Sequence, residues 1–479
     1  MTYIATALIK TLVFTLTLFA LSTADANTCN YYASPVGSGN GVSPSTPFRI
    51  KDFWSVVKPG QTLCLLDGVY NGSHSMIFPP ENLNGISGAP ITVRALNDGK
   101  VLINGAGGEV PIRLYHNSWF IIEGVNACCS NADVVGIFQS SNNIIRRVAG
   151  WNAADANRMI FALAGGTHNL LEDIAGWGIA RKILESCCNA NFTTVRRFWG
   201  RWDGSHFVGP KMTLSLAYNN TDMLVENSIG TWSGSAMKET YTLACDPGTP
   251  YQPCGKTFTN YSVDQPQGIF SIDGITSGDR NARSKLLGSI AYVQDTDRYS
   301  YSYVNLINSL DSITLENDVV YIKPGFYKNV KPFGLLAEGV DGNRLIADKL
   351  TSFGTSASTI LGWRTSNILH GTAASAVYAS GEGIFNANRG ANLCYAYQDG
   401  TRTTKALWPW PMDQRIKEAM AASGHRSVTY GMETKDGLVT TAIEQMFGKI
   451  PANCKAGVAG NAPLTPPSAP INLEVQTQG

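Results

Sequence analysis

A short internal repeat between about residues 116 and 355 constrains the fold of this chain more than any other feature of its sequence. Each copy contains a short apolar segment, a turn rich in Asn, Ser or Gly, a second short apolar segment and a longer variable loop. Clear copies begin at residues 135, 159, 182 and 213, and weaker copies begin at residues 303 and 334. Such a repeat indicates a unit that cannot bury its apolar side alone and therefore stacks on its neighbours.

The spacing of the copies indicates which stacked architecture is present. Equivalent places in the second apolar segments are 26, 24 and 30 residues apart, at Arg147, Asp173, Arg197 and Asn227. Regular strands joined by loops of variable length are typical of a β-helix, whose coils lie about 4.8 Å apart. A propeller would need a longer and more uniform period of four strands, and a β-sandwich is the other rival. The sequence therefore predicts an all-β parallel β-helix solenoid.

Asparagines recur in the turn between the two apolar segments. Asn143, Asn169 and Asn191 occupy this turn in successive copies, and Asn220 is a further candidate. Because equivalent residues of stacked coils lie above one another, these amides are expected to form a ladder in which each bonds the next.

The charge balance excludes some classes of partner. The 479 residues include 37 Lys and Arg against 36 Asp and Glu, for a formal charge of +1. No overall field favours nucleic acid or an acidic membrane surface, so neither is expected as a partner. The 48 glycines suit a β-rich chain with many tight turns, because Gly accepts the positive φ angles that such turns need.

The first residues are typical of a secretion signal. Lys10 precedes the apolar stretch 11–21, and Ala24-Asp25-Ala26 has the small-x-small pattern of a cleavage site. The alternative is an uncleaved membrane anchor, but the apolar stretch is short for a membrane span. We therefore expect residues 1–26 to be a signal peptide, the mature chain to be secreted, and no membrane span to follow.

The cysteine count also favours an exported protein, because ten cysteines follow the predicted signal and can pair as disulfides. Two vicinal pairs match no reliable zinc spacing, and buried, stacked thiols are the alternative for them. They are Cys128 with Cys129 and Cys187 with Cys188. The predicted disulfides are Cys29–Cys64 and Cys394–Cys454 at the two ends, and Cys245–Cys254 across a Pro/Gly loop.

The opening of the chain, together with the repeat, resembles a known family. The segments are YYASP at residues 31–35, KPGQTL at 58–63 and LDGVY at 66–70. They resemble the opening of right-handed parallel β-helix proteins of the pectate-lyase-like superfamily, most closely the chondroitinase-B/alginate-lyase type. The resemblance covers about residues 28–385. It implies a right-handed solenoid and a polysaccharide partner. The catalytic cations and calcium carboxylates of that family have no residue-by-residue match in this sequence, so the site is inferred from its own residues.

The C-terminal part differs from the repeat region. Residues 412–424 and 438–447 have helical spacing, which predicts a small helical cap on the solenoid. The expected organisation is a β-helix domain at 27–390, a capping segment at 391–455, and a Pro-rich linker from 456 to 479. Residues 467–473 resemble the start of a fibronectin type III module, so further C-terminal modules are possible partners.

Basic residues near the start of successive first strands form the main candidate site. The alignment places Arg158, Lys182 and Lys211 in one column, with Arg181 beside Lys182. Spaced cations of this kind can bind the carboxylates or sulfates of a polyanionic sugar chain. The alternative is a set of solvated strand ends.

Polar and aromatic residues lie next to this column. The loop at residues 200–206 supplies Arg201, Trp202, Asp203 and His206, and residues 238–241 open a long insertion with Lys238 and Tyr241. Aromatic rings can carry sugar faces, although they serve equally well as core anchors. The four tryptophans that follow the second strands are Trp151, Trp177, Trp202 and Trp232.

The preferred chemistry is β-elimination on a uronate. Lys182 or Lys211 would be the base, Arg158 or Arg201 would neutralise the carboxylate, and His206 or Tyr241 would supply a proton. The expected substrate-binding residues are Arg181, Glu185, Trp202, Asp203, Trp232, Lys238 and Tyr241.

Two other functions stay open. A glycoside hydrolase would use paired carboxylates from Asp203, Glu185 and Glu239. A non-catalytic glycan-binding or cell-surface protein would use the same groove without cleavage. The sequence requires no cofactor, and calcium is possible although no compact Asp-x-Asp motif occurs.

Overall fold

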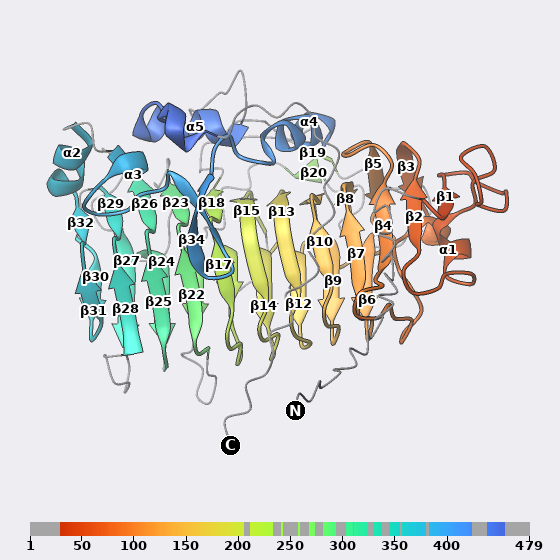
Figure 1. The fold of residues 1–479 in the computed structure, drawn as a ribbon, viewed down its shortest axis with the longest axis horizontal. Coiled ribbons are helices and arrows are strands. Elements are labelled where there is room, and N and C mark those ends of the chain that lie inside the picture. Colours follow the sequence, from red (N-terminus) through yellow and green to blue (C-terminus); the bar gives the residue numbers. More distant parts are fainter. Residues whose placement is uncertain are drawn as a thin grey trace, which may run out of the picture. The chain divides into compact units, whose positions relative to one another are not determined.

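The computed structural model describes residues 29–205, 211–232, 241–242, 257–258, 268–273, 281–293, 303–309, 311–323, 330–337, 344–354, 357–379, 383–423 and 438–455. Residues 29–460 belong to one compact unit. The predicted all-β solenoid is confirmed, because parallel strands stack coil upon coil along one axis (Figure 1).

The strands of a coil lie on three faces. Face 1 is a nine-stranded parallel sheet. Its strands are β6 (Ile112–Tyr115), β9 (Val135–Phe138), β12 (Met159–Ala164), β14 (Lys182–Cys187), β16 (Met212–Leu216), β21 (Gly268–Asp273), β24 (Tyr303–Ser309), β27 (Lys331–Ala337) and β30 (Thr359–Leu361). The first apolar segments of the repeat are therefore the strands of face 1.

Faces 2 and 3 form one 21-stranded sheet, because β13 (Leu170–Trp177) and β15 (Thr194–Trp202) bend from one face into the other. Face 2 also contains β1 (Tyr31–Ala33), β2 (Thr62–Leu65), β4 (Ile91–Ala95), β7 (Phe120–Glu123), β10 (Ile144–Arg146), β17 (Leu224–Glu226), β22 (Ser284–Leu287), β25 (Ile313–Glu316), β28 (Leu345–Asp348) and β31 (Arg364–Ser366). Face 3 also contains β3 (Gly68–Asn71), β5 (Val101–Asn104), β8 (Val125–Cys128), β11 (Ala149–Trp151), β18 (Ile229–Trp232), β23 (Ile290–Val293), β26 (Val319–Ile322), β29 (Thr351–Phe353) and β32 (Leu369–His370). The sequence predicts only a variable loop after each second apolar segment. The structure has the face 3 strands there, and these strands were not predicted.

The remaining elements lie outside the three faces. The hairpin strands β19 (Tyr241–Thr242) and β20 (Thr257–Phe258) pair antiparallel, as do β33 (Tyr395–Gln398) and β34 (Thr401–Ala406). The helices are α1 (Ile50–Phe53), α2 (Thr372–Ala379), α3 (Gly383–Asn386), α4 (Asp413–Ser423) and α5 (Leu438–Phe447). None of the helices in the described part of the chain is long and apolar enough to cross a membrane.

Alternating side chains explain how the strands bury a core. In β4, Ile91, Val93 and Ala95 are buried, while Thr92 and Arg94 are partly exposed. This period of two sends one set of residues into the solenoid and the other set outward. The same inner rows of Ile, Val, Leu and Phe from successive coils form one continuous core cluster.

The corner between faces 2 and 3 depends on one left-handed residue in each coil. Arg147, Asp173, Arg197 and Asn227 have φ angles of 50°, 52°, 53° and 47°. These are the equivalent places that the repeat identifies, so the spacing of the copies marks this corner. A single residue at positive φ turns the chain between two strands, which is why Asn and Asp are favoured there.

The asparagine ladder is only partly as predicted. Asn143 and Asn169 are equivalent and buried, and the backbone N–H of Asn143 donates to the Asn169 side chain at 3.1 Å. Asn191 instead pairs with Thr167, two residues earlier in the register, and Thr193 takes the ladder position. The turn after β14 has one residue more than the turn after β12, which accounts for one of these two positions. Asn220 and Asn281 form a separate step, in which the N–H of Asn220 donates to the Asn281 side chain.

Charged side chains alternate along the outer side of face 2. In strand register, Arg94, Glu123, Arg146, Glu172, Arg196 and Glu226 follow one another across successive coils. The N–O distances between neighbours in this charge ladder range from 3.0 to 4.0 Å. The row therefore neutralises itself from coil to coil.

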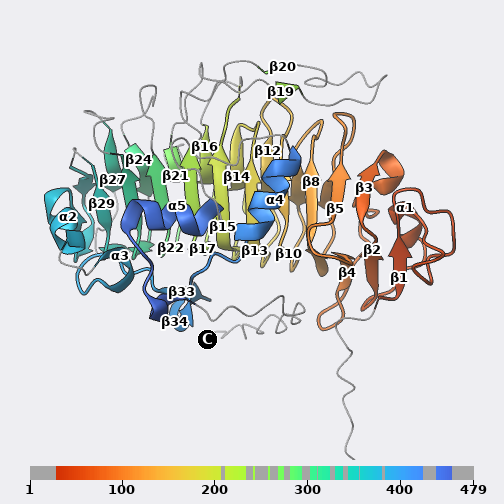
Figure 2. The same ribbon diagram turned by 90° about the horizontal axis from the view of Figure 1, so that it is seen from above.

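The C-terminal segment lies along face 3 (Figures 1 and 2). The two predicted helices are formed as α4 and α5, but they lie along the side of the coils. Arg415 of α4 contacts Asp98 and Asn126, while Phe447 of α5 packs on Phe353. We call residues 391–423 and 438–455 the strap, because they lie along many coils lengthwise. Helix α2 lies beside the last face 3 strands.

Disulfides fix the two ends of the described chain. Cys29–Cys64 and Cys394–Cys454 are bonded, with Cα–Cα distances of 5.6 and 4.6 Å, so both predictions are confirmed. Each vicinal pair is closed on itself, as Cys128–Cys129 and Cys187–Cys188, so neither pair is a set of free thiols. Cys245 and Cys254 lie outside the described residues.

Candidate functional site

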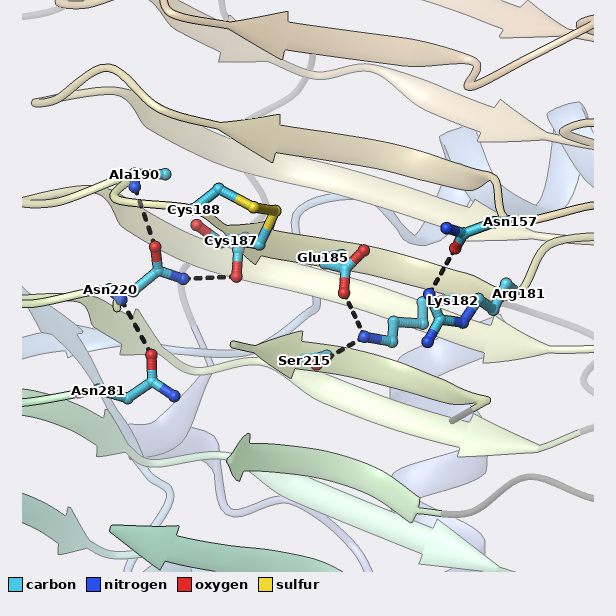
Figure 3. Close-up of a disulfide and its surroundings, with 11 residues drawn as sticks. Asn157, Arg181, Lys182, Glu185, Cys187, Cys188, Ala190, Ser215, Asn220 and Asn281 are labelled. Carbon is cyan, nitrogen blue, oxygen red and sulfur yellow. Dashed lines mark hydrogen bonds and ion pairs between the residues drawn. A yellow bond between two sulfur atoms is a disulfide. The ribbon is translucent and has the colours of Figure 1, made fainter. Parts of the chain in front are cut away.

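A buried lysine–glutamate pair lies on the outer side of face 1 (Figure 3). The ammonium of Lys182 donates to Glu185 and, at 3.1 Å, to the hydroxyl of Ser215 on the next strand. Lys182 and Glu185 are only 2% and 3% exposed. Ile183 and Leu184 between them both belong to the core, so the alternation of inner and outer side chains is interrupted in β14 between the two charged residues.

Small residues surround Glu185 on face 1. In register, Ala162 precedes Glu185 and Ser215 follows it, while Gly136 lies one further coil away. These neighbours carry no long side chain that could pair with the carboxylate. Ala162 and Ser215 are themselves only 3% and 2% exposed, so the charged pair lies in a buried, small-residue part of face 1.

Asp133, just before β9, adds a second carboxyl group. It is 4% exposed, accepts a hydrogen bond from the N–H of Met159 at 2.8 Å and pairs with Arg158 at 3.3 Å. Burial raises the pKa of Asp133, and the charge of Glu185 acts in the same direction, while Met159 and Arg158 oppose it. Two carboxyl groups that sense each other and differ in environment are suited to acid and base roles.

The basic residues that are equivalent in the structure differ from those that the sequence alignment places in one column. Lys182 is in register with Met159 and Met212, so the equivalent residues one place earlier are Arg158, Arg181 and Lys211. The Arg158 side chain is 47% exposed, whereas Arg181 and Lys211 are buried. The expectation that Lys182 points into solvent is wrong, because its ammonium is held by Glu185.

Arg201 and Asp203 form the corner between faces 3 and 1. The fully buried Arg201 donates through Nε to Asp203 at 2.6 Å, and Asp203 also accepts the N–H of Gly178 at 2.8 Å. Both charges of the pair are therefore engaged within the protein. This corrects the expectation that Arg201 and Asp203 are groove residues.

The tryptophans also have internal roles. Trp151 and Trp177 stack with ring centroids 5.2 Å apart, and both lie in the cluster beneath the strap. Trp202 and Trp232 belong to the interior core. All four rings are at most 4% exposed, so the expectation of a sugar platform on them is wrong.

Several predicted residues lie outside what the structure describes. They are His206, Lys238 and Glu239, together with the side chain of Tyr241, whose backbone belongs to β19. Across the described ranges, no three His, Cys, Asp or Glu side chains are grouped so that they could hold a metal ion.

The residue that the sequence analysis missed is Asp133. It lies in the turn that joins face 3 to face 1, in the coil before Arg158, with a side chain that caps the start of the next face 1 strand. A carboxylate just before the first strand of a copy is the sequence signal that marks it. Asp133, Arg158, Arg181, Lys182 and Glu185 together define the candidate site.

These features define an all-β solenoid with a buried charged site on face 1. No family model and no curated protein matches the chain. Solved structures similar to it include pectate lyase Pel9A, 14% identical with a TM-score of 0.45 over 71% of this chain and 78% of that one. An alginate lyase from Paenibacillus sp. str. FPU-7 is 13% identical, with a TM-score of 0.38 over 67% of this chain and 94% of that one. The Streptococcus pneumoniae surface adhesin PfbA is 10% identical, with a TM-score of 0.42 over 71% and 89%.

Proposed function

We propose that this protein binds an acidic polysaccharide along face 1 and cleaves it by β-elimination at the candidate site. The observation that supports this proposal is the buried Lys182–Glu185 pair, together with Asp133, whose pKa is raised by burial and by the charge of Glu185. Arginines at the edge of the group add the positive charge that a uronate needs.

The proposed reaction begins with a proton transfer inside the pair. Glu185 accepts a proton from the ammonium of Lys182, and the neutral amine then removes the proton from C5 of the uronate. Arg158 and Arg181 stabilise the negative charge that develops on the uronate carboxylate. The bond between C4 and the glycosidic oxygen breaks, a C4–C5 double bond forms, and the leaving oxygen takes its proton from the carboxyl group of Asp133, whose neutral form is favoured by burial.

Hydrolysis is the second candidate, because Asp133 and Glu185 are two interacting carboxyl groups in different environments. One would protonate the leaving oxygen, and the other would act as nucleophile or activate water. A third candidate is glycan binding without cleavage.

A panel of uronate-containing and sulfated polysaccharides distinguishes the three candidates. Elimination produces an ultraviolet-absorbing unsaturated uronate, and hydrolysis produces new reducing ends without that absorbance. Retardation in a glycan-containing gel without either product supports binding alone. Repeating the assay with EDTA and then with added Ca²⁺ tests whether a cation besides the arginines is needed.

Variants of the pair test the assignment of residues. Lys182→Met and Glu185→Gln should each lower the cleavage rate by about a hundredfold or more, because each removes one acid–base group. Lys285→Met, on the exposed side of β22, is the matched control for loss of one lysine charge and should leave the rate unchanged. Full activity of Lys182→Met would overturn the proposed mechanism.

Secretion is part of the same proposal. The disulfides of the described residues form and persist in an oxidising compartment, which suits an exported protein. Sequencing the N-terminus of the mature protein tests cleavage after residue 26.

A further inference from the structure

Three aromatic rings hold one arginine on face 1, away from the candidate site. Arg113 projects from β6, and its guanidinium carbon lies 5.3 Å from the ring centroid of Phe78, 5.2 Å from that of Tyr115 and 5.8 Å from that of Phe138. Phe78 is 45% exposed, and Arg113 and Tyr115 are partly exposed. The rings fix the position of the cation and leave apolar surface beside it.

The charge of Arg113 is not neutralised by any described residue. Its guanidinium makes no ion pair and no hydrogen bond within the described ranges, and its Nε is buried without a hydrogen-bond partner. The arginines of the charge ladder, by contrast, each lie within 4.0 Å of a glutamate. A positioned cation without a counter-ion is suited to bind an anion from outside.

The strand register links Arg113 to the candidate site. Arg113, Gly136, Ala162 and Glu185 occupy one outward row in four successive coils. Three coil spacings give about 14 Å, which is roughly the length of three sugar units. Gly136 and Ala162, between the two ends of the row, are buried and carry only a hydrogen and a methyl group, so neither adds a charged side chain between Arg113 and Glu185. The ring of Phe138 leans over Gly136, where an added Cβ would lie 2.4 Å from it.

We propose that Arg113, Phe78, Tyr115 and Phe138 form a subsite that binds one acidic sugar unit of the polysaccharide, about three units from the reacting bond. The guanidinium pairs with the carboxylate or sulfate of that unit, and the exposed rings pack against the apolar face of its pyranose ring. This inference rests on the proposed function for the identity of the ligand as a sugar chain. It adds the requirement for an acidic unit at a fixed distance from Glu185.

Binding of oligosaccharides of defined length tests the subsite. The full chain carrying Glu185→Gln is titrated with uronate oligosaccharides of two to six units, with sulfated ones and with neutral ones of equal length. Affinity for the acidic series should rise at about four units, where the chain first reaches Arg113, and the neutral series should show no such step. Arg113→Gln should remove the step, which is about a tenfold loss for the longer oligosaccharides.

Controls separate a subsite from a structural effect. Arg364→Gln removes the same charge from an exposed residue of β31 and should leave the length dependence intact. Arg113→Lys keeps the charge and should restore part of the step, and Phe138→Leu tests the ring contribution. In a chain with an intact site, Arg113→Gln should raise KM for long substrates without lowering kcat, which a general loss of folding would not produce.

The outcomes separate this inference from the proposed function. If long acidic substrates are cleaved but their affinity and KM do not respond to Arg113→Gln, the subsite is wrong and the proposed function stands. If the Arg113-dependent step is present and no polysaccharide is cleaved, the subsite stands and the proposed catalysis is wrong. If neither short nor long acidic oligosaccharides bind, both are overturned.

Discussion

Charged side chains are paired differently on faces 1 and 2 of the same solenoid. On face 2, the charge ladder places arginines and glutamates alternately in strand register, so each charge finds its partner on the next coil. On face 1, Arg113 has no counter-ion among the described residues, and Lys182 and Glu185 are paired within a single strand. A ladder that neutralises itself stabilises the stack, whereas charges that do not repeat between coils are available for chemistry.

The largest expected effect is at the centre of the ladder. Glu172 lies 3.0 Å from Arg146, 3.2 Å from Arg196 and 2.8 Å from Arg197. Glu172→Ala leaves three arginines together without their shared partner and should destabilise the protein by about 3 kcal/mol. Thermal unfolding measures the loss, and glycan binding should be unaffected. Lost binding with an unchanged unfolding temperature would show that the ladder is part of the site.

The two faces should also differ in the sign of their pH dependence. Burial acts to raise the pKa of Glu172, but the charges of Arg197, Arg196 and Arg146 lower it below its ordinary value of 4.5. The stabilisation by Glu172 is therefore present above that value and is lost as the pH falls. Asp133, whose pKa is raised by burial from 3.8, contributes most below that value, and its contribution is lost as the pH rises through the folded-state pKa.

Melting temperatures of Glu172→Gln and Asp133→Asn across the acid range check these signs. The deficit of Glu172→Gln relative to the unmodified protein should shrink as the pH falls from neutral, and the deficit of Asp133→Asn should grow. Parallel pH profiles for the two variants would contradict the contrast between the faces.

A smaller effect is expected for a single cation of the ladder. Arg146→Met removes the ion pair with Glu172 but leaves Glu172 with Arg196 and Arg197. The expected loss is about 1 to 2 kcal/mol, because the buried carboxylate keeps other partners. Chemical denaturation of this variant beside Glu172→Ala shows whether the shared glutamate matters more than one arginine.

The smallest effect is expected at an exposed pair. Arg283 and Asp222 lie 2.6 Å apart at the corner between faces 1 and 2, and the Arg283 side chain is 55% exposed. Arg283→Gln should change stability by less than about 0.5 kcal/mol, since solvent screens an exposed pair. If Arg283→Gln lowered stability as much as Arg146→Met does, burial would not explain why the ion pairs of the charge ladder contribute more than an exposed pair.

The repeat predicts most of the fold because strand alternation and corner residues leave a clear pattern. The first and second segments correspond to strands of faces 1 and 2, and the equivalent places at Arg147 and Asp173 are true corner residues. The face 3 strand β11 was not predicted because it has only three residues and contains Gly150. Asn191 was misaligned because it lies two positions before the ladder position, and one extra turn residue accounts for only one of them.

The site was harder to predict because the spacing of residues in the sequence does not show which way a side chain points or how deeply it is buried. Lys182 lies where a strand begins, and its pairing with Glu185 depends on the packing of both Ile183 and Leu184 into the core. Asp133 is acidic, so the column of basic residues did not include it, and Arg113 lies in the coil before the first clear copy. Their roles depend on which groups lie above them in the stack.

The strap has a consequence for the order in which the chain can complete its fold. Trp177 donates a hydrogen bond to Ser423, which is 246 residues later, and Trp151 and Trp199 lie in the same cluster with the strap. At about 5 to 20 residues per second, the ribosome needs on the order of ten to fifty seconds to add those residues. During this time the coils can stack, but their apolar side lacks its cover. A nascent chain of this protein therefore passes through a stage in which a row of tryptophans is open to chaperones or to another copy, and synthesis of the last helices ends that exposure.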